Sequence, residues 1–318
     1  MSTGDTGANA IAPLEKRYRR IIRCLPKAYR EDRAEEMLTA LLDGAVPGRT
    51  RPKTGEVFSL GALAVRLRFG APGASTRGQL TGDVVRRAVL VSLMAGTVLS
   101  SNTFAFFFAH AAAAPVLGVL GYDLLRPVLF LALLFGWRRV GRTLSAVYLA
   151  ITLYATYELF LVPFSGGAVF EPVLTLLDIG LGVVTMLAVF PAFHREAPKM
   201  GNRRWWLALW AVPPLVIGCT STLFSFQFET DDLLWPAFYV ISGVAVAAFA
   251  VAKFRASPVW PIALAVGIWP LLISGAEGAF FPFREADAVV VGASCAAEAV
   301  VIAAALASLV YRRRLVPA

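Results

Sequence analysis

The pattern of apolar and polar positions divides the chain at about residue 83. Before it, short apolar stretches recur with the period of a helix, and after it eight longer apolar runs follow one another. A helix needs about 20 apolar residues, rising 1.5 Å each, to cross the ~30 Å hydrocarbon core of a bilayer. We therefore expect an all-α, polytopic membrane protein with eight transmembrane helices. They are placed at about 84–108, 114–136, 143–163, 172–193, 205–227, 233–252, 258–280 and 288–310.

Three short amphipathic helices are predicted before the first span. Each repeats apolar side chains along one face: Leu14, Tyr18, Ile21, Ile22 and Leu25, then Ala34, Met37, Leu38, Leu41 and Leu42, then Val57, Leu60, Leu63, Ala64 and Leu67. Pro13 suits a first helical turn, and Pro26 ends the first helix. Gly44 suits a C-terminal cap and Thr54 an N-terminal cap.

These patterns predict a small cytoplasmic three-helix domain in front of the membrane domain. The expected order is a disordered N-terminus at 1–12, the helical domain at 13–69, a linker at 70–83, the eight-helix transmembrane domain at 84–310 and a basic cytoplasmic tail at 311–318. So small a helical core is marginal alone and often needs a partner.

Basic residues are distributed unevenly between the predicted loops. Loops that would lie on one side hold 12 Lys and Arg residues, whereas those on the other side hold one. The positive-inside rule therefore predicts a multi-pass protein of the inner (cytoplasmic) membrane with both termini in the cytoplasm. Anionic lipid of the bilayer is then a sufficient partner for a net charge of +9, and direct binding of nucleic acid need not be invoked.

Composition supports a membrane protein and argues against an enzyme. The chain is 58% apolar and 16% charged, against about 25% charged in an ordinary soluble domain. Three cysteines and two histidines, all far apart, predict neither a disulfide framework nor a metal site. The motifs of P-loop ATPases, zinc proteases and serine hydrolases are missing from the sequence. We expect no catalytic residues and no cofactor.

The predicted spans contain a repeat. Glu158 opens "ELFLVPF" and Glu277 opens "EGAFFPF", 119 residues later. The segments "SSNTFAF" (100–106) and "TSTLFSF" (220–226) lie 120 residues apart. The matching offsets predict two halves of four spans each. Because four is an even number, both halves have the same orientation and form a 4+4 parallel repeat.

Six ionisable residues within the predicted spans form a candidate intramembrane polar site: Asp123, Arg126, Glu158, Asp178, Glu277 and Glu298. Charged groups in lipid are costly, so these side chains are expected to face the protein interior. One interpretation is a polar cavity open to the exterior that binds a cation, a proton or a polar ligand. The other is a set of hydrogen bonds between helices, made by protonated carboxyls.

The segment "LPKAYREDRAEEMLTALLDGAVPGRTRP" (25–52), followed by "EVFSLGALAVRLR", resembles the N-terminal part of a group of actinobacterial membrane proteins. The shared pattern is LP-x-x-YR-x-x-R-x-x-EM-x-x-x-LL, a PG-x-x-x-P turn and a helix ending in R-x-R. It is similar to the HAAS module, a small helical cytoplasmic domain. The likeness runs from about Tyr18 to Phe69 and carries no catalytic residues. It implies a role in signalling beside PadR-like transcription factors.

The leading hypothesis is accordingly a signalling or regulatory membrane component that acts through its HAAS-like domain. Its expected partner is a cytoplasmic regulator of a PadR-like or sigma-factor system. The predicted partner surface consists of Tyr29, Glu35 and Glu36 on the second helix. Two alternatives stay open: a permease for a small solute or ion that uses the acidic cavity, and a subunit of a larger complex. The oligomeric state is not predicted.

Overall fold

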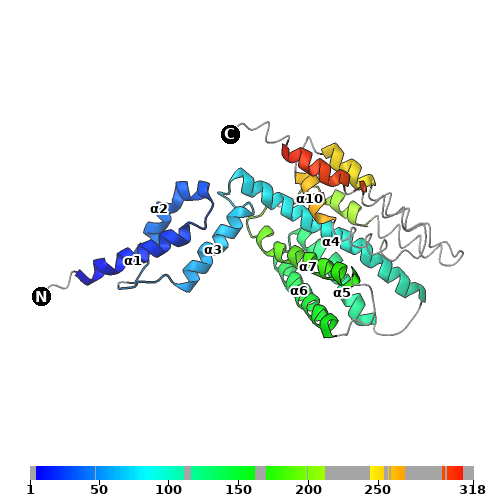
Figure 1. Cartoon of the computed structure of the whole chain (residues 1–318), viewed down its shortest axis with the longest axis horizontal. Coiled ribbons are helices and arrows are strands. Elements are labelled where there is room, and N and C mark those ends of the chain that lie inside the picture. Colours follow the sequence, from blue (N-terminus) through cyan, green and yellow to red (C-terminus); the bar gives the residue numbers. More distant parts are fainter. Residues whose placement is uncertain are drawn as a thin grey trace. The chain divides into compact units, whose positions relative to one another are not determined.

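The computed structural model describes residues 5–46, 48–110, 116–161, 170–198, 200–211, 244–253, 257, 259–268, 296–297 and 299–310. Every regular element in these ranges is an α-helix (Figure 1). By its internal contacts the chain divides into two compact units. The first comprises Met1–Asp83 with His194–Ala197, and the second comprises Val84–Phe193 with Pro198–Ala318.

The first unit contains the three helices that the periodicity predicts. They are α1 (Asp5–Ile22), α2 (Lys27–Asp43) and α3 (Thr54–Arg68), and α1 packs against both α2 and α3 (Figure 1). Residues 5–12, predicted to be disordered, form the beginning of α1, so Pro13 lies inside the helix and not in its first turn. Residues 76–83 of the predicted linker are also helical, because α4 (Thr76–His110) begins at Thr76.

The predicted apolar faces supply the core of the first unit. One cluster of buried residues contains Leu14, Tyr18, Ile22, Leu25, Leu38, Ala64, Leu67 and Ala71, and Leu60 is buried as well. Met37, Leu41 and Leu42 pack against this cluster and stay partly buried. The pattern places Val57 on the same face of α3 as Leu60, but Val57 is 39% exposed. Burying one such aliphatic side chain fully stabilises the folded state by about 1.5–3 kcal/mol, so the cluster accounts for the association of the three helices.

Local hydrogen bonds define where α2 and α3 end. Gly44 caps α2 with a negative φ of −80°, and its N–H donates to the Ala40 carbonyl at 3.2 Å. Lys53, not Thr54, is the N-cap of α3, and its backbone N–H donates to the Glu56 carboxylate at 2.9 Å. This is the Glu half of a capping box, which satisfies one N–H at the helix start.

A glycine fixes the close approach of α4 to the end of α3. A Cβ atom at Gly78 would lie 2.5 Å from the Leu67 carbonyl oxygen, which no side chain tolerates without movement of the backbone. The guanidinium of Arg68 donates to the Cys24 carbonyl at 2.8 Å and joins the end of α3 to the turn between α1 and α2. The end of α3 is thus held by close backbone contact with α4 and by the hydrogen bond that Arg68 donates to Cys24.

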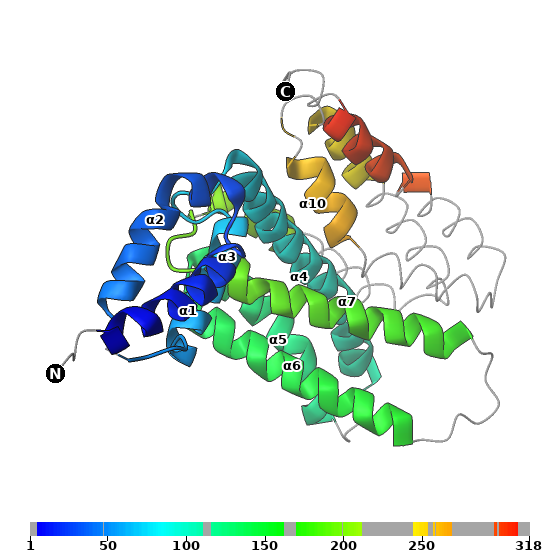
Figure 2. The same ribbon diagram turned by 60° about the vertical axis from the view of Figure 1, so that its left-hand side comes forward.

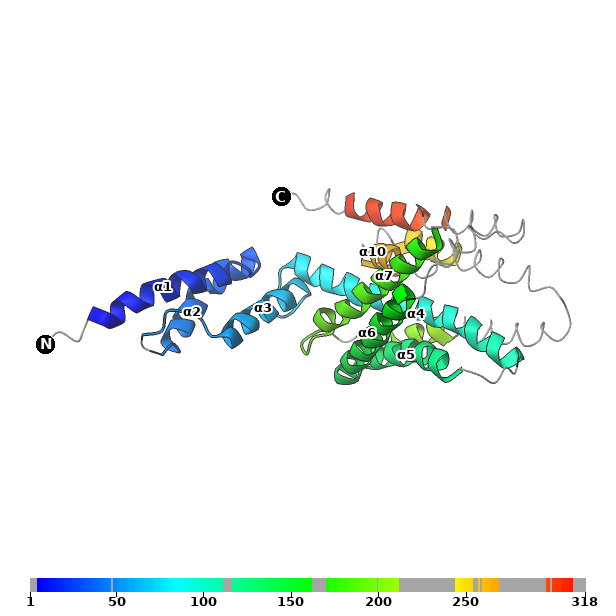
Figure 3. The same cartoon turned by 60° about the horizontal axis from the view of Figure 1, so that its bottom comes forward.

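The second unit holds the rest of α4 together with α5 (Val116–Phe135), α6 (Arg138–Leu161), α7 (Phe170–Ala192) and α10 (Val259–Gly267). Residues 203–211, 244–253 and 299–310 are also helical. Consecutive helices pack side by side, α5 on α6 and α6 on α7 (Figures 2 and 3). The short turn between α5 and α6 passes through Gly136, whose φ of 80° favours glycine.

Aromatic rings join several segments of the second unit. Phe130 of α5 stacks on Trp210 with 5.6 Å between ring centroids, and Trp206 stacks on Trp260 of α10 at 5.4 Å. The guanidinium carbon of Arg87 lies 4.7 Å from the Trp260 ring centroid. A cation over an indole face stabilises the contact by about 0.5–2 kcal/mol, so α4 and α10 are joined by more than apolar packing.

The structure does not bear out the predicted transmembrane domain. Among the helices of the described residues, none is long and apolar enough to cross a membrane. This finding contradicts, in the part of the chain that the structure describes, the eight-span fold and the multi-pass location in the inner membrane with both termini cytoplasmic. Length is the physical reason for α10, which has nine residues. Charge is the reason for α5, which includes Asp123 and Arg126, and for α6, which begins with two arginines.

Much of the predicted repeat lies outside the described residues. More than half of each of the predicted spans at 205–227, 233–252 and 258–280 falls there, as do residues 288–295 and 298 of the last span and the tail at 311–318. The segment "EGAFFPF" that opens at Glu277 is also outside. The expectation of a lipid bilayer as partner depends on the same spans.

Candidate functional site

A buried tyrosine and a carboxylate connect α1 to α3. The Tyr18 hydroxyl donates to Oε2 of Glu56 at 2.5 Å, and the Lys53 backbone N–H donates to the same oxygen at 2.9 Å. Tyr18 is 1% exposed. Its burial, and next the Glu56 carboxylate, raises the pKa of Tyr18 to about 12. The bond from Tyr18 lowers the pKa of Glu56. A neutral phenol and an ionised carboxylate therefore face each other at neutral pH.

The sequence pattern identified Tyr18 only as an apolar residue and did not identify Glu56. A buried tyrosine needs a partner for its hydroxyl, and that need was the available signal. The two residues are 38 positions apart, so helical periodicity alone could not pair them. The pair holds two helices together and offers no group to a substrate.

The predicted partner surface on α2 is partly occupied by the protein itself. Both Glu35 carboxylate oxygens accept bonds from the Arg19 guanidinium, at 2.6 and 3.1 Å, and Arg19 Nε also donates to Glu15 at 2.8 Å. Tyr29 is half-buried, and a Cβ at Gly73 would lie 3.2 Å from its ring. Glu36 is exposed. Of the three predicted residues, Glu35 has its charge balanced within the unit.

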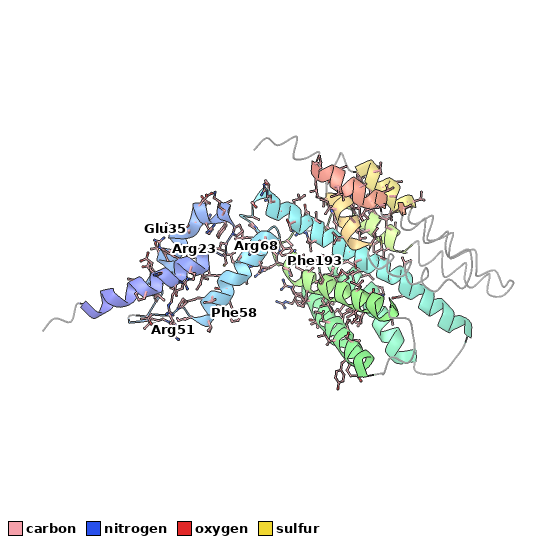
Figure 4. The ribbon with its side chains drawn as sticks, in the orientation of Figure 1. Arg23, Glu35, Arg51, Phe58, Arg68 and Phe193 are labelled. Atoms are coloured by element: carbon pink, nitrogen blue, oxygen red, sulfur yellow. The ribbon has the colours of Figure 1, made fainter. Side chains whose placement is uncertain are left out.

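A row of cations lies on the outer side of α1. Lys16, Arg20 and Arg23 follow one another at i, i+4 and i+7, which places them on one side of the helix. They line a shallow hollow of about 320 Å³ together with Ala12, Glu15 and Arg19. In the described part of the chain, none of these three cations forms an ion pair. We call Lys16, Arg20 and Arg23 the α1 cationic row; Arg23 is labelled in Figure 4.

The candidate polar site in the second unit is described only in part. Side chains are described for two of its residues, Arg126 of α5 and Asp178 of α7. Asp123 lies on α5 and Glu158 on α6, but the structure does not describe their side chains. Glu277 and Glu298 are outside the described residues altogether.

Arg126 brings three helices together. Its Nε donates to the Tyr148 hydroxyl of α6 at 3.0 Å, and its Nη1 lies 3.5 Å from the Gly96 carbonyl of α4. A Cβ at Gly96 would lie 2.9 Å from the Arg126 side chain, so the glycine makes room for it. Burial raises the pKa of Asp178, and the charge of Arg126 opposes that rise. Neither Tyr148 nor Gly96 stands out in the pattern of apolar and charged residues.

Two other arginines bind the C-terminal end of α7. Arg86, only 2% exposed, donates to the Ala192 carbonyl at 3.3 Å. Arg142 donates to the Phe190 carbonyl at 3.3 Å and to the Phe193 carbonyl at 3.4 Å; Phe193 is labelled in Figure 4. Cations stabilise the last carbonyls of a helix and its dipole, so this arrangement is structural.

Within the described ranges, no three His, Cys, Asp or Glu side chains come together in a way that could hold a metal ion. Comparison with known proteins adds no assignment, because no family model, curated protein or solved structure matches the chain. The α1 cationic row is therefore the described feature that offers most to a binding partner.

Proposed function

We propose that the first unit is a protein-binding module that serves regulation. The observation that carries the proposal is the α1 cationic row. Like charges at i, i+4 cost a helix a few tenths of a kcal/mol per pair, so the row does not stabilise α1. Acidic groups of a partner would offset the repulsion between these cations, and charge attraction would also speed its association.

The chemistry of the row favours an acidic protein over a nucleic acid. Glu15 lines the same hollow as the row, and the exposed Glu35 lies nearby as a partner of Arg19. A carboxylate beside the cations repels a continuous phosphate backbone, whereas an acidic protein can present basic residues at that point. The HAAS-like pattern of residues 18–69 supports a regulator as this partner, of the PadR-like or sigma-factor type.

The arrangement of the core supports a binding role for the unit as a whole. The buried cluster draws on all three helices, and the Tyr18–Glu56 bond joins α1 to α3. These contacts on the inner side of α1 fix the helix that carries the α1 cationic row. A rigid helix presents its charges without the entropic cost of ordering them when the partner binds.

The experiment compares transcript levels in cells that lack the gene and carry a rescue copy. One rescue copy has Lys16→Glu and Arg23→Glu; the matched control has Arg33→Glu and Arg77→Glu, which change the net charge equally at exposed positions elsewhere in the unit. Deletion should alter a defined set of transcripts, and wild type and control should restore it. The Lys16/Arg23 variant should fail to restore it at equal protein level.

Two outcomes contradict the proposal. Full rescue by the Lys16/Arg23 variant would show that the row has no regulatory role. Retention of a DNA fragment by the purified wild-type protein, lost in that variant, would identify a nucleic acid as the partner instead.

A further inference from the structure

The helix α3 has two apolar faces, of which the core uses one. Leu60, Ala64 and Leu67 recur at i, i+4 and i+7, and all three are buried. Phe58, Ala62 and Val65 recur with the same spacing, about 200° away around the helix. Phe58 is 79% exposed and Val65 is 41% exposed. We call Phe58, Ala62 and Val65 the outer stripe of α3.

Space beside the outer stripe is open. A Cβ atom at Gly61, or at Gly55 six residues earlier, would meet no atom within 4 Å among the described residues. Glycines here let another backbone approach closely, with Phe58 projecting beside them (Figure 4). Three apolar positions at i, i+4 and i+7 are the usual footprint on which one amphipathic helix packs against another.

Charge decides what kind of helix fits. Between residues 45 and 70 the chain has five cations, Arg49, Arg51, Lys53, Arg66 and Arg68, and one carboxylate, Glu56. The Glu56 carboxylate already accepts hydrogen bonds from the Tyr18 hydroxyl and the Lys53 N–H. Around the axis of α3, Arg66 and Arg68 lie on opposite sides of the outer stripe, about 80° from Phe58. The apolar stripe therefore has a cationic border that would repel a second copy of this chain.

We infer that the outer stripe of α3 docks an amphipathic helix of a partner protein whose apolar face is bordered by Glu and Asp. This inference rests on the proposed function and names the shape and charge of the partner. Leucine-sized side chains of the partner pack beside Phe58 and over Gly61. Its carboxylates pair with Arg51, Lys53 and Arg66, for which no ion pair exists in the described part of the chain.

The test is a selection on the immobilised full-length protein. The library displays amphipathic helices about as long as α3, with Leu on one face and either Glu or Lys at each bordering position. The selected peptides are then measured against Phe58→Ala, against Arg66→Glu, and against two matched controls, Val46→Ala and Arg77→Glu. All four positions carry exposed or half-exposed side chains, so folding should be retained, which circular dichroism checks.

Acid-bordered peptides should be enriched. Phe58→Ala and Arg66→Glu should each weaken them by about tenfold or more, and the controls by less than about twofold. Enrichment of Lys-bordered peptides, no enrichment, or binding that Phe58→Ala leaves unchanged would each overturn the inference. So would a wild-type dimer that Phe58→Ala converts to a monomer, since a second copy would then cover the stripe.

This binding experiment is independent of transcript levels. Peptide binding that ignores Phe58, together with loss of rescue by the Lys16/Arg23 variant, would refute the docking site and leave the regulatory proposal standing. Phe58-dependent binding, together with full rescue by the Lys16/Arg23 variant, would support the docking site and refute the regulatory role of the α1 cationic row.

Discussion

Replacing Tyr18 by phenylalanine measures the connection between α1 and α3 directly. The change removes one hydroxyl oxygen and keeps the buried ring. A hydrogen bond to a charged group contributes about 1.5–3 kcal/mol. Glu56 is only half-buried and keeps its bond from the Lys53 N–H, so water replaces part of the loss. We therefore expect Tyr18→Phe to lower the free energy of unfolding of the first unit by about 1.5 kcal/mol.

A double-mutant cycle with Glu56→Gln isolates the bond itself. Hydrogen-exchange mass spectrometry of the full-length protein, read from peptides of α1 and α3, reports the local free energy of opening. The coupling energy between the two sites should be about 1 kcal/mol or more. Tyr29→Phe is the matched control, because Tyr29 is a half-buried tyrosine of the same unit that packs on Gly73. A coupling below about 0.5 kcal/mol would refute the reasoning.

The same pair predicts a dependence on pH. The pKa of Tyr18 is about 12 in the folded protein and about 10 in an unfolded chain. The associated stability is complete below about pH 10 and is lost as pH rises toward 12, by about 3 kcal/mol at most. The ultraviolet difference titration between wild type and Tyr18→Phe should show a phenolate midpoint near 12. A midpoint near 10 would mean that Tyr18 is exposed to water.

Three further changes test the packing of both units. Leu38→Ala should lower the unfolding free energy of the first unit by about 2–5 kcal/mol, measured by hydrogen exchange; a loss below about 1 kcal/mol would contradict its burial. Gly78→Ala should cost about 1–3 kcal/mol, because the new methyl group would meet the Leu67 carbonyl, and unchanged exchange in α3 would contradict that contact. Arg126→Met removes the charge that holds down the pKa of Asp178, so an NMR titration should find that carboxyl titrating at higher pH. A lower or unchanged pKa would show that the two groups do not interact.

The helices of the first unit could be predicted because their apolar residues repeat with one period and their ends carry stop signals. Gly44 caps α2 as expected, and Pro26, expected to end the first helix, is the N-cap of α2. The start of α1 could not be predicted in the same way. Proline favours a first turn, but the alanines at 8, 10 and 12 have high helix propensity, and α1 continues through Pro13 to Asp5.

Contacts between distant residues could not be predicted. The pattern places Tyr18 in the core but does not say which polar group meets its hydroxyl. The pattern also does not show that Arg126 meets Tyr148 and Gly96, which lie on other helices. The eight-span prediction was wrong for the part of the chain that the structure describes, where no helix is both long and apolar enough to cross a membrane. The apolar runs did not show that α10 has only nine residues, or that Arg86 and Arg142 bind carbonyls within the second unit.

The position of the core near the beginning of the chain has a consequence for synthesis. All residues that form or flank the buried cluster of the first unit lie between Leu14 and Ala74, and about three quarters of the 318 residues follow. A ribosome that adds about 5–20 residues per second needs roughly 10–50 s to add residues 75–318. Small helical domains fold in microseconds to milliseconds. The first three helices therefore have time to assemble while translation continues, and the outer stripe of α3 becomes accessible to a partner on the nascent chain.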